Sequence, residues 1–496
     1  MGSRSELTDS ERVAHVLSRL TFGPRPGDTQ RVASIGVDRW IDQQLQPETV
    51  PDPAIGFALA PLITWNRPAV RLASVEETPR RLATTPMADL MRDTAALTEL
   101  RMLGLQLARL SPDEDFFAGK VIRAQVSERQ LYEVLVDFWE NHFSVYGGKM
   151  PSREALAVWD RDVLRPYALG KFRDLLGAVA HSPAMLFYLD NYLSAADGLN
   201  ENYGRELLEL HTLGVDGGYS QHDVVEVARA FTGWTIGQSR EPSVFEFRPE
   251  RHDTGAKIVL GHVLRAGRGI EDGEEVLDIL ARHPSTARHI AFKLTRRLVS
   301  DDPPPAVVDR AAATFARTDG DIAAVVRTIV TSPEFFSRAA FRAKVKTPFE
   351  LVVSARRAID APPDTTPVTV RQIAQLGMPI FGWPTPEGWP DRGDAWMNFG
   401  EIYKRIRFGN DVAGQVASAP IDRWRDWISF SSLPVERQVD GIVADVLGGS
   451  ADTATRNAML ASRTGADSLE TGVASKQRVL RELLTIAFAS PQFQRR

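Results

Sequence analysis

Apolar residues recur with helical spacing through most of the 496-residue chain, and this feature restricts the fold more than any other. Near the start, Thr8 or Ser10 can cap a first helix, which Gly23 and Pro24 end. A second strong helical pattern covers residues 126–145. Strand patterns are sparse. The sequence therefore predicts a mainly α-helical protein, built as a large multi-helix orthogonal bundle.

One stretch departs from the helical pattern in the manner of β-structure. Within residues 243–261, Phe245 and Phe247 alternate with polar residues, a turn follows at 253–255, and Lys257–Leu260 returns. We therefore expect one minor β-hairpin between helices.

The length of the chain favours one continuous body with two lobes. We expect a main helical domain over residues 10–345, which includes the hairpin at 243–261. Residues 51–86 are rich in proline and lack a sustained period, so they predict an irregular surface excursion. A C-terminal helical lobe over residues 346–496 would pack on the main domain.

Composition excludes several classes of protein. The net charge of −5 gives no reason to expect nucleic-acid binding, which calls for a basic excess. The absence of cysteine removes disulfides, thiolate zinc sites, iron–sulfur clusters and cysteine nucleophiles. No apolar run approaches the ~20 residues of a transmembrane helix. The N-terminus lacks a signal-peptide pattern, which predicts a cytoplasmic protein; export would require a leader that was removed or a partner that carries one.

The most polar helical stretch is "NENYGRELLELHTLG", residues 200–214. On an unbroken helix its glutamates and His211 point to opposite sides, so they do not form a metal motif. Glu201 and Arg205 are spaced as an ion pair on a solvated face, which explains the charges without catalysis. His211 and His142 both fall on apolar arcs and are expected in the core. A haem or metal redox protein using these two histidines is therefore the weakest functional alternative.

Two further pairs combine chemistry with loop positions. His252 and Asp253 place an imidazole beside a carboxylate at a turn, although aspartate before Thr-Gly is also ordinary turn chemistry. Glu387 and Trp389 lie on the stiff loop "PTPEGWP". A carboxylate with an aromatic ring is a common sugar-handling pair, but tryptophan also anchors such loops. The motifs of serine hydrolases, zincins, P-loop enzymes and dinucleotide oxidoreductases are absent.

Several motifs, taken in order, resemble a large bacterial family, domain of unknown function 1800 (DUF1800). They are "HVLSRLTFGPRPGD", "DFWENHFSVY", "NENYGRELLELHTLGVDGGYSQHDVVEVARAFTGW", "HDTGAKIVLG", "HPSTARHIAFKLTRRLV", "KTPFELVVSARRAI" and "PTPEGWPD". The resemblance spans about residues 10 to 496. It implies no established reaction, but members are often exported and often encoded beside an alkaline-phosphatase-like or sulfatase-like protein. The family's polar motif positions fall here on Asn200, Glu201, Asn202, Arg205, Glu206, His211, Tyr219, Asp223, His252 and Asp253.

The leading hypothesis is a hydrolase-like enzyme that acts on a polar polymer such as a glycan. Glu201 or Glu206 would serve as general acid or base, while His252 with Asp253 would orient water or hold a divalent metal. The guanidinium of Arg205 suits a carboxylate or sulfate of the substrate. The expected substrate-binding residues are Asn202, Arg205 and Trp389. The alternative is a non-catalytic helical scaffold or chaperone for the phosphatase-like or sulfatase-like partner.

Overall fold

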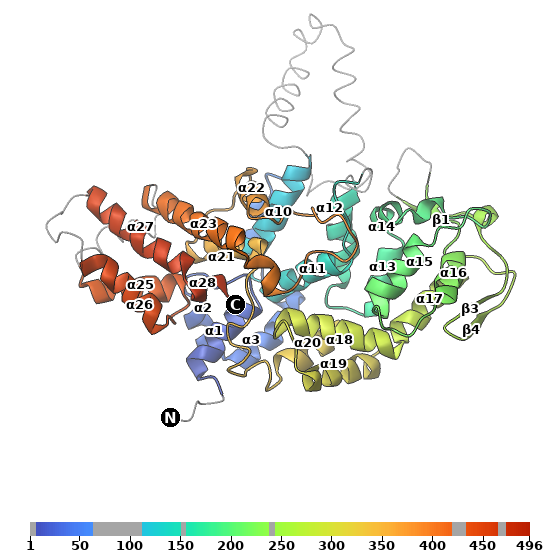
Figure 1. The fold of residues 1–496 in the computed structure, drawn as a ribbon, viewed down its shortest axis with the longest axis horizontal. Coiled ribbons are helices and arrows are strands. Elements are labelled where there is room, and N and C mark those ends of the chain that lie inside the picture. Colours follow the sequence, from blue (N-terminus) through green and yellow to red (C-terminus); the bar gives the residue numbers. More distant parts are fainter. Residues whose placement is uncertain (1–5, 63–111, 150–154, 238–243, 419–432, 465–472) are drawn as a thin grey trace, which may run out of the picture.

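A computed structural model describes residues 6–62, 112–149, 155–237, 244–418, 433–464 and 473–496. Helices make up most of this part of the chain, and its strands form two small antiparallel sheets of two strands each. The prediction of a mainly α-helical fold is confirmed. The molecule is elongated, with the C-terminal helices at one end and both sheets at the other (Figure 1). None of the described helices has the length and apolar character that a membrane span requires.

The N-terminal segment forms helices whose ends follow the predicted signals. Thr8 caps the first helix, and its hydroxyl and Glu11 form a reciprocal capping box. The strong pattern at 126–145 corresponds to one helix over residues 130–142, which is separated from the preceding helix by Ser127, whose hydroxyl accepts a hydrogen bond from the Arg129 amide. The elements are α1 (Asp9–Arg19), α2 (Asp28–Ile35), α3 (Val37–Gln44), η1 (Pro47–Thr49), α4 (Pro53–Leu59), α10 (Pro112–Val126) and α11 (Gln130–His142).

The expected surface excursion at 51–86 is only partly visible. Its first residues form α4, with Pro53 in the first turn, so the prediction of irregular structure is wrong there. Residues 63–86 lie outside the described residues.

The middle of the chain contains two π-helical segments, in which hydrogen bonds run from residue i to i+5. One of them, η7, continues directly from α15. Ser220 caps the following helix with Asp223 in a second capping box. The elements are α12 (Leu156–Val158), η4 (Trp159–Leu164), η5 (Arg165–Tyr167), α13 (Phe172–Ala180), α14 (Pro183–Tyr188), η6 (Asn191–Leu193), α15 (Asn202–Glu206), η7 (Leu207–Thr212) and α16 (Gln221–Ala230).

The predicted strands exist, but the predicted pairing between them is wrong. Strand β2 (Phe245–Phe247) pairs with β1 (Trp234–Ile236), and β3 (Lys257–Val259) pairs with β4 (His262–Leu264). Leu260 and Gly261 both have positive φ and make a tight turn directly after β3. The chain after β3 therefore turns back and pairs with β3 as strand β4, whereas β2 pairs with β1, which precedes it in the sequence.

The second half of the chain returns to helices. Helix α18 packs on α19, and α23 packs on α27 near the far end of the molecule (Figure 1). The elements are η8 (Pro249–Arg251), α17 (Glu271–Arg282), α18 (Pro284–Leu298), α19 (Pro305–Arg317), α20 (Ile322–Val330), α21 (Pro348–Ala358), α22 (Val368–Gln375), η9 (Gly393–Trp396), α23 (Phe399–Ser418), α25 (Val435–Val446), α26 (Thr453–Thr464), α27 (Val473–Ala489) and α28 (Pro491–Gln494). The division into lobes near 345 remains a prediction, although α21 packs directly on α10.

Candidate functional site

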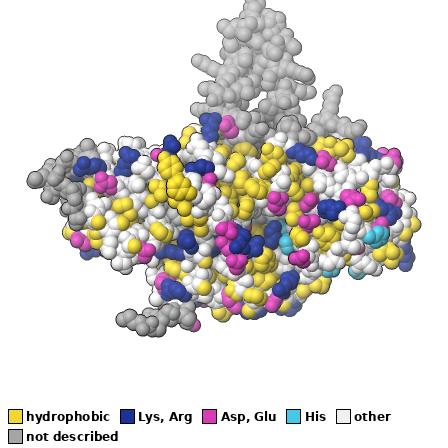
Figure 2. Space-filling view, viewed as in Figure 1, with side chains coloured by type: hydrophobic (Ala, Val, Ile, Leu, Met, Phe, Trp, Pro, Cys, Tyr) yellow, Lys and Arg dark blue, Asp and Glu magenta, His cyan; other side chains and the backbone are white. Residues whose placement is uncertain are grey.

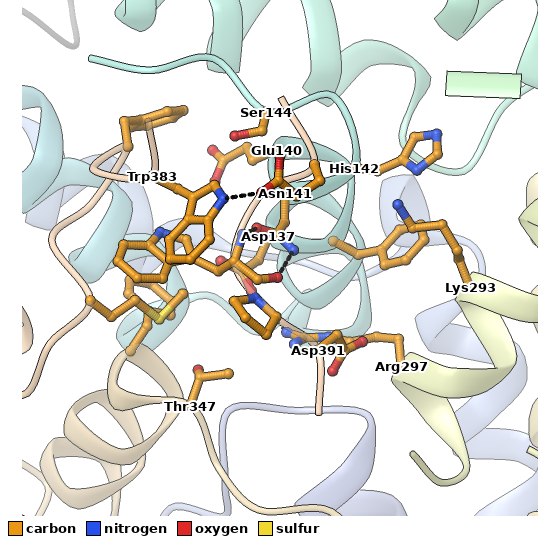
Figure 3. A pocket seen from close by; sticks show the side chains of 18 of the residues that line it. Asp137, Glu140, Asn141, His142, Ser144, Lys293, Arg297, Thr347, Trp383 and Asp391 are labelled. Carbon is orange, nitrogen blue, oxygen red and sulfur yellow. Dashed lines mark hydrogen bonds and ion pairs between the residues drawn. The ribbon is translucent and has the colours of Figure 1, made fainter. Parts of the chain in front are cut away.

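A cavity of about 410 Å³ lies where α11, α18 and the proline-rich loop 376–392 meet. Figure 3 shows side chains of α11, including Asp137, Glu140 and Asn141, facing Trp383 from the loop and Lys293 and Arg297 from α18. The volume falls within the range of sites that hold small ligands. Three segments that are far apart in the sequence therefore build one polar cavity.

The loop is tied to α11 by the side chain of Asn141. Its amide nitrogen donates to the Trp389 carbonyl at 2.8 Å, and its amide oxygen accepts from the Trp389 N–H at 2.7 Å. Gly388 has a φ of +75°, and a Cβ at this position would lie only 2.7 Å from the Asn141 side-chain oxygen. Glycine is thus required for this close approach.

Aromatic rings form one wall of the cavity. The ring centroids of Trp383 and Trp389 are 4.7 Å apart, and those of Trp389 and Trp396 are 5.8 Å apart. Trp383 and Trp389 are half-buried, so part of each ring stays accessible. Flat apolar faces beside carboxylates suit the hydrophobic face of a sugar ring.

Most charged groups in the cavity wall already have partners. Lys120 binds both Asp137 and Glu140, and Arg297 binds Asp137 at 2.8 Å. Asp391 accepts from Lys344 at 2.7 Å. One oxygen of Glu140 is buried without a hydrogen-bond partner in the described part of the chain. These paired groups form a charged part of the cavity wall in which the side chains hold one another in place.

A separate pair of carboxyls has opposite electrostatic environments. Burial raises the pKa of Glu206 to about 7, and the negative charges of Glu209 and Glu387 add to this effect. Partial burial acts to raise the pKa of Glu387, but hydrogen bonds from Thr385 and Trp383 outweigh it and hold that pKa below its usual value. Glu387 lines the cavity, and its negative charge contributes to the raised pKa of Glu206.

Tyr188 lies near both carboxyls and hydrogen bonds to the loop that carries Glu387. Its hydroxyl donates to the Pro384 carbonyl at 3.1 Å. Burial raises its pKa, and the charges of Glu387 and Glu206 raise it further. The phenol therefore stays protonated beside both carboxyls.

The π-helix changes the predicted arrangement of residues 200–213. The Leu213 amide donates to the Leu208 carbonyl at 2.9 Å, so the unbroken α-helix assumed for the helical wheel is wrong beyond Glu206. Glu209 consequently accepts from the Tyr219 hydroxyl at 3.2 Å, while no ion pair joins it to Arg205 in the described residues. π-Segments of this kind occur frequently at functional sites.

The expected solvated face is present at the start of this helix. Arg205 pairs with Glu201 at 3.2 Å, and Gln221 hydrogen bonds to both residues. Asn202 is exposed, and its side chain donates to the Leu189 carbonyl at 3.3 Å. Glu201, Asn202 and Arg205 are not among the residues that line the cavity.

The turn at His252 and Asp253 lies in a different network. One ring nitrogen of His252 contacts the Thr232 carbonyl at 2.8 Å, and the other lies 3.4 Å from buried Asp272, which also binds Lys257. Asp253 accepts from Arg229 at 2.7 Å, and this bond lowers its pKa to about 2. Neither residue lines the cavity.

The two core histidines are buried, as predicted, and they lie close to Lys293. His142 contacts the His211 carbonyl at 3.2 Å, whereas neither ring nitrogen of His211 has a hydrogen-bond partner in the described residues. Burial lowers the pKa of His211 to about 3 and that of Lys293 to about 8. Among the described residues, no three His, Asp or Glu side chains meet in a way that could hold a metal ion.

A model of one protein family matches residues 15–495, nearly the whole chain, and is described as "Protein of unknown function (DUF1800)". The chain belongs to the DUF1800 family. Comparison with curated proteins gave no match, and neither did comparison with solved structures. The motifs that suggested DUF1800 thus agree with the family model. Because the family description names no reaction, the function of this DUF1800 member is inferred from the geometry of its cavity.

Among the predicted site residues, Trp389 lines the cavity and the others do not. Glu206 is linked to the cavity only through Glu387, whose negative charge contributes to its raised pKa. Three residues that line the cavity carry partial signals in the sequence, although they are not among the predicted site residues. Asn141 points away from the apolar stripe of its helix, Lys293 lies off the stripe of α18, and Glu387 neighbours Trp389 on the loop. Asn141 and Lys293 share one signal: each is a polar residue that lies outside the apolar face of its helix and has no partner of opposite charge four positions later. This signal would have predicted both as site residues.

Proposed function

We propose that this DUF1800 member is a hydrolase-like acid/base enzyme that cleaves a polar polymer, with a glycan as the best-suited class. The proposal is supported by Glu387, which lines the cavity beside Trp383 and Trp389, and by Glu206, whose pKa is raised in part by the charge of Glu387. The pKa values of the two carboxyls are moved in opposite directions. Enzymes that hydrolyse glycosidic bonds require one carboxylic acid and one carboxylate in this manner.

In this proposal the two carboxyls have distinct roles. Protonated Glu206 donates its proton to the leaving-group oxygen as the bond from that oxygen to carbon breaks. Ionised Glu387 accepts a proton from the water that attacks the same carbon. Trp389, held by Asn141, supports the sugar ring, and Tyr188 keeps the loop next to the acid.

The remaining expected site residues have supporting roles in this proposal. His252 and Asp253 are already occupied by Thr232, Asp272 and Arg229, so they would fix their turn rather than activate water. Glu201 and Arg205 would contact the parts of a long polymer that extend beyond the cavity, since both are accessible at the surface.

The experiment is a screen of polysaccharides for release of reducing ends by wild type, Glu206→Gln, Glu387→Gln and the distant control Glu246→Gln. We expect the first two variants to lose at least a hundredfold in kcat, because each removes a proton-transfer group. Glu246→Gln should retain wild-type turnover, since Glu246 pairs with Arg248 on β2. Full turnover in both cavity variants, or no hydrolysis of any glycan by wild type, would refute the proposal.

One observation favours a second function, that of a scaffold for another protein. Helix α23 exposes Phe399, Ile402, Tyr403 and Ile406 along one face, and Phe399 is 90% accessible. Hydrophobic side chains gather on that part of the surface in Figure 2. Such a stripe is typical of a helix that docks in a groove. Loss of co-purification with a sulfatase-like or phosphatase-like protein after Phe399→Ser would support this function.

A further inference from the structure

In the part of the chain that the structure describes, each charged side chain of the cavity wall except one has a hydrogen-bond or ion-pair partner. Lys120 and Arg297 both bind Asp137, and Lys120 also binds Glu140. Arg296 donates to the Asp301 carbonyl at 3.1 Å. Arg392 pairs with Asp302, Asp391 with Lys344, and Glu387 accepts from its own loop. Among the described residues, Lys293 alone of this group has no hydrogen bond or ion pair.

Among the described residues, no carboxylate bonds directly to Lys293. Figure 3 shows its side chain on the same side of the cavity as His142. The imidazoles of His142, His211 and His289 are neutral there, because burial holds their pKa values below the usual range. The charges that act on the pKa of Lys293 are those of Asp391, which is already bound to Lys344, and of the cation Arg296.

A half-buried ammonium without a partner is energetically unfavourable, and proteins keep such groups mainly where a ligand supplies the counter-charge. We propose that Lys293 forms an anion subsite in the cavity and that the substrate is an acidic saccharide, whose carboxylate or sulfate binds this ammonium. The saccharide part of this inference rests on the proposed function, whereas the anion subsite rests on the geometry of Lys293 alone.

The subsite has a direct consequence for the pH range of binding. Burial lowers the pKa of Lys293 to about 8, and only the charged ammonium attracts an anion. Affinity for an acidic ligand should therefore weaken as the pH rises through about 8. The bound anion stabilises the ammonium, so the pKa of Lys293 should rise on binding.

The test labels lysine side chains with ¹³C-methyl groups, which preserve their charge, and follows them by NMR. The Lys293 signal is identified by its absence in Lys293→Met, and the exposed Lys404, which pairs with Glu401, provides a control signal in the same sample. Three probes are titrated at constant ionic strength: inorganic sulfate, trigalacturonate and its neutral methyl ester.

We expect sulfate and trigalacturonate to move the Lys293 signal and raise its apparent pKa while the Lys404 signal stays in place. Trigalacturonate should bind about tenfold more tightly than its methyl ester, which is ~1.4 kcal/mol, and Lys293→Met should abolish this preference. Movement with sulfate alone would identify a sulfated saccharide, and movement with trigalacturonate alone a uronate.

A Lys293 signal that neither anion moves would overturn the inference. That result is independent of the test of the proposed function. Hydrolysis of a neutral glycan that depends on Glu206 and Glu387 would then leave the acid/base proposal standing, and anion binding without any hydrolysis would leave the subsite standing.

Discussion

The contact between Gly388 and Asn141 allows the stability of the cavity loop to be perturbed by one methyl group. In Gly388→Ala the new Cβ would overlap the backbone oxygen of Asn141 and crowd its side-chain oxygen, so the loop must move. Alanine at a φ of +75° costs ~1 kcal/mol. Loss of the two Asn141–Trp389 hydrogen bonds costs about 1 kcal/mol each, for a total near ~3 kcal/mol.

Gly261→Ala provides a matched control. Gly261 has a φ of +80°, but a Cβ there would meet nothing within 4 Å. This substitution therefore carries only the backbone cost of ~1 kcal/mol. The difference of ~2 kcal/mol between the variants isolates the contact with Asn141 and corresponds to about 30-fold in an equilibrium constant.

Native-state hydrogen exchange measures the local opening of each segment directly. The amide of Trp389 reports on the loop, because it donates to Asn141, and the amides of β3 and β4 report on the turn at Gly261. We expect the loss of protection at Trp389 in Gly388→Ala to exceed the loss at the turn in Gly261→Ala by about 30-fold. Equal losses would refute the reasoning, because the Asn141 contact would then contribute nothing.

Two further predictions concern ionisable groups. Folding raises the pKa of Glu206 from 4.5 to about 7, so ionisation of this carboxyl destabilises the folded protein. The free energy of unfolding of wild type should therefore fall relative to that of Glu206→Gln as the pH rises from about 4.5 to about 7. Parallel urea titrations across this range check the sign, and parallel curves would contradict it. Asp272→Asn removes the carboxylate from the fully buried Lys257 and should destabilise the protein by ~3–5 kcal/mol in urea unfolding, whereas a loss below ~1 kcal/mol would show that Lys257 finds another partner.

Local signals in the sequence predicted local structure well. Thr8 begins the first helix, as predicted, because its hydroxyl accepts an amide hydrogen bond, a relation confined to four successive residues. The burial of His142 and His211 followed from apolar periodicity alone. The family resemblance was also carried by short motifs, and the family model confirms it.

Features that depend on distant contacts were predicted poorly. The partner of β2 could not be chosen from the sequence, because the tight turn at Leu260–Gly261 decides the pairing of β3. The π-segment after Glu206 rotates Glu209 away from Arg205, and no composition rule marks where an α-helix widens. The cavity brings residues of α11 together with a loop 248 positions later in the sequence. Single residues of the cavity could therefore be predicted as candidates, but their proximity could not.

That separation also sets the order of events during synthesis. Asn141 leaves the ribosome 248 residues before the backbone that it will hold, a delay of roughly 12–50 s at ordinary elongation rates. Throughout this interval the loop is not yet present to cover the polar edge of α11. The cavity is thus complete only in chains whose translation has passed the tryptophan-bearing loop.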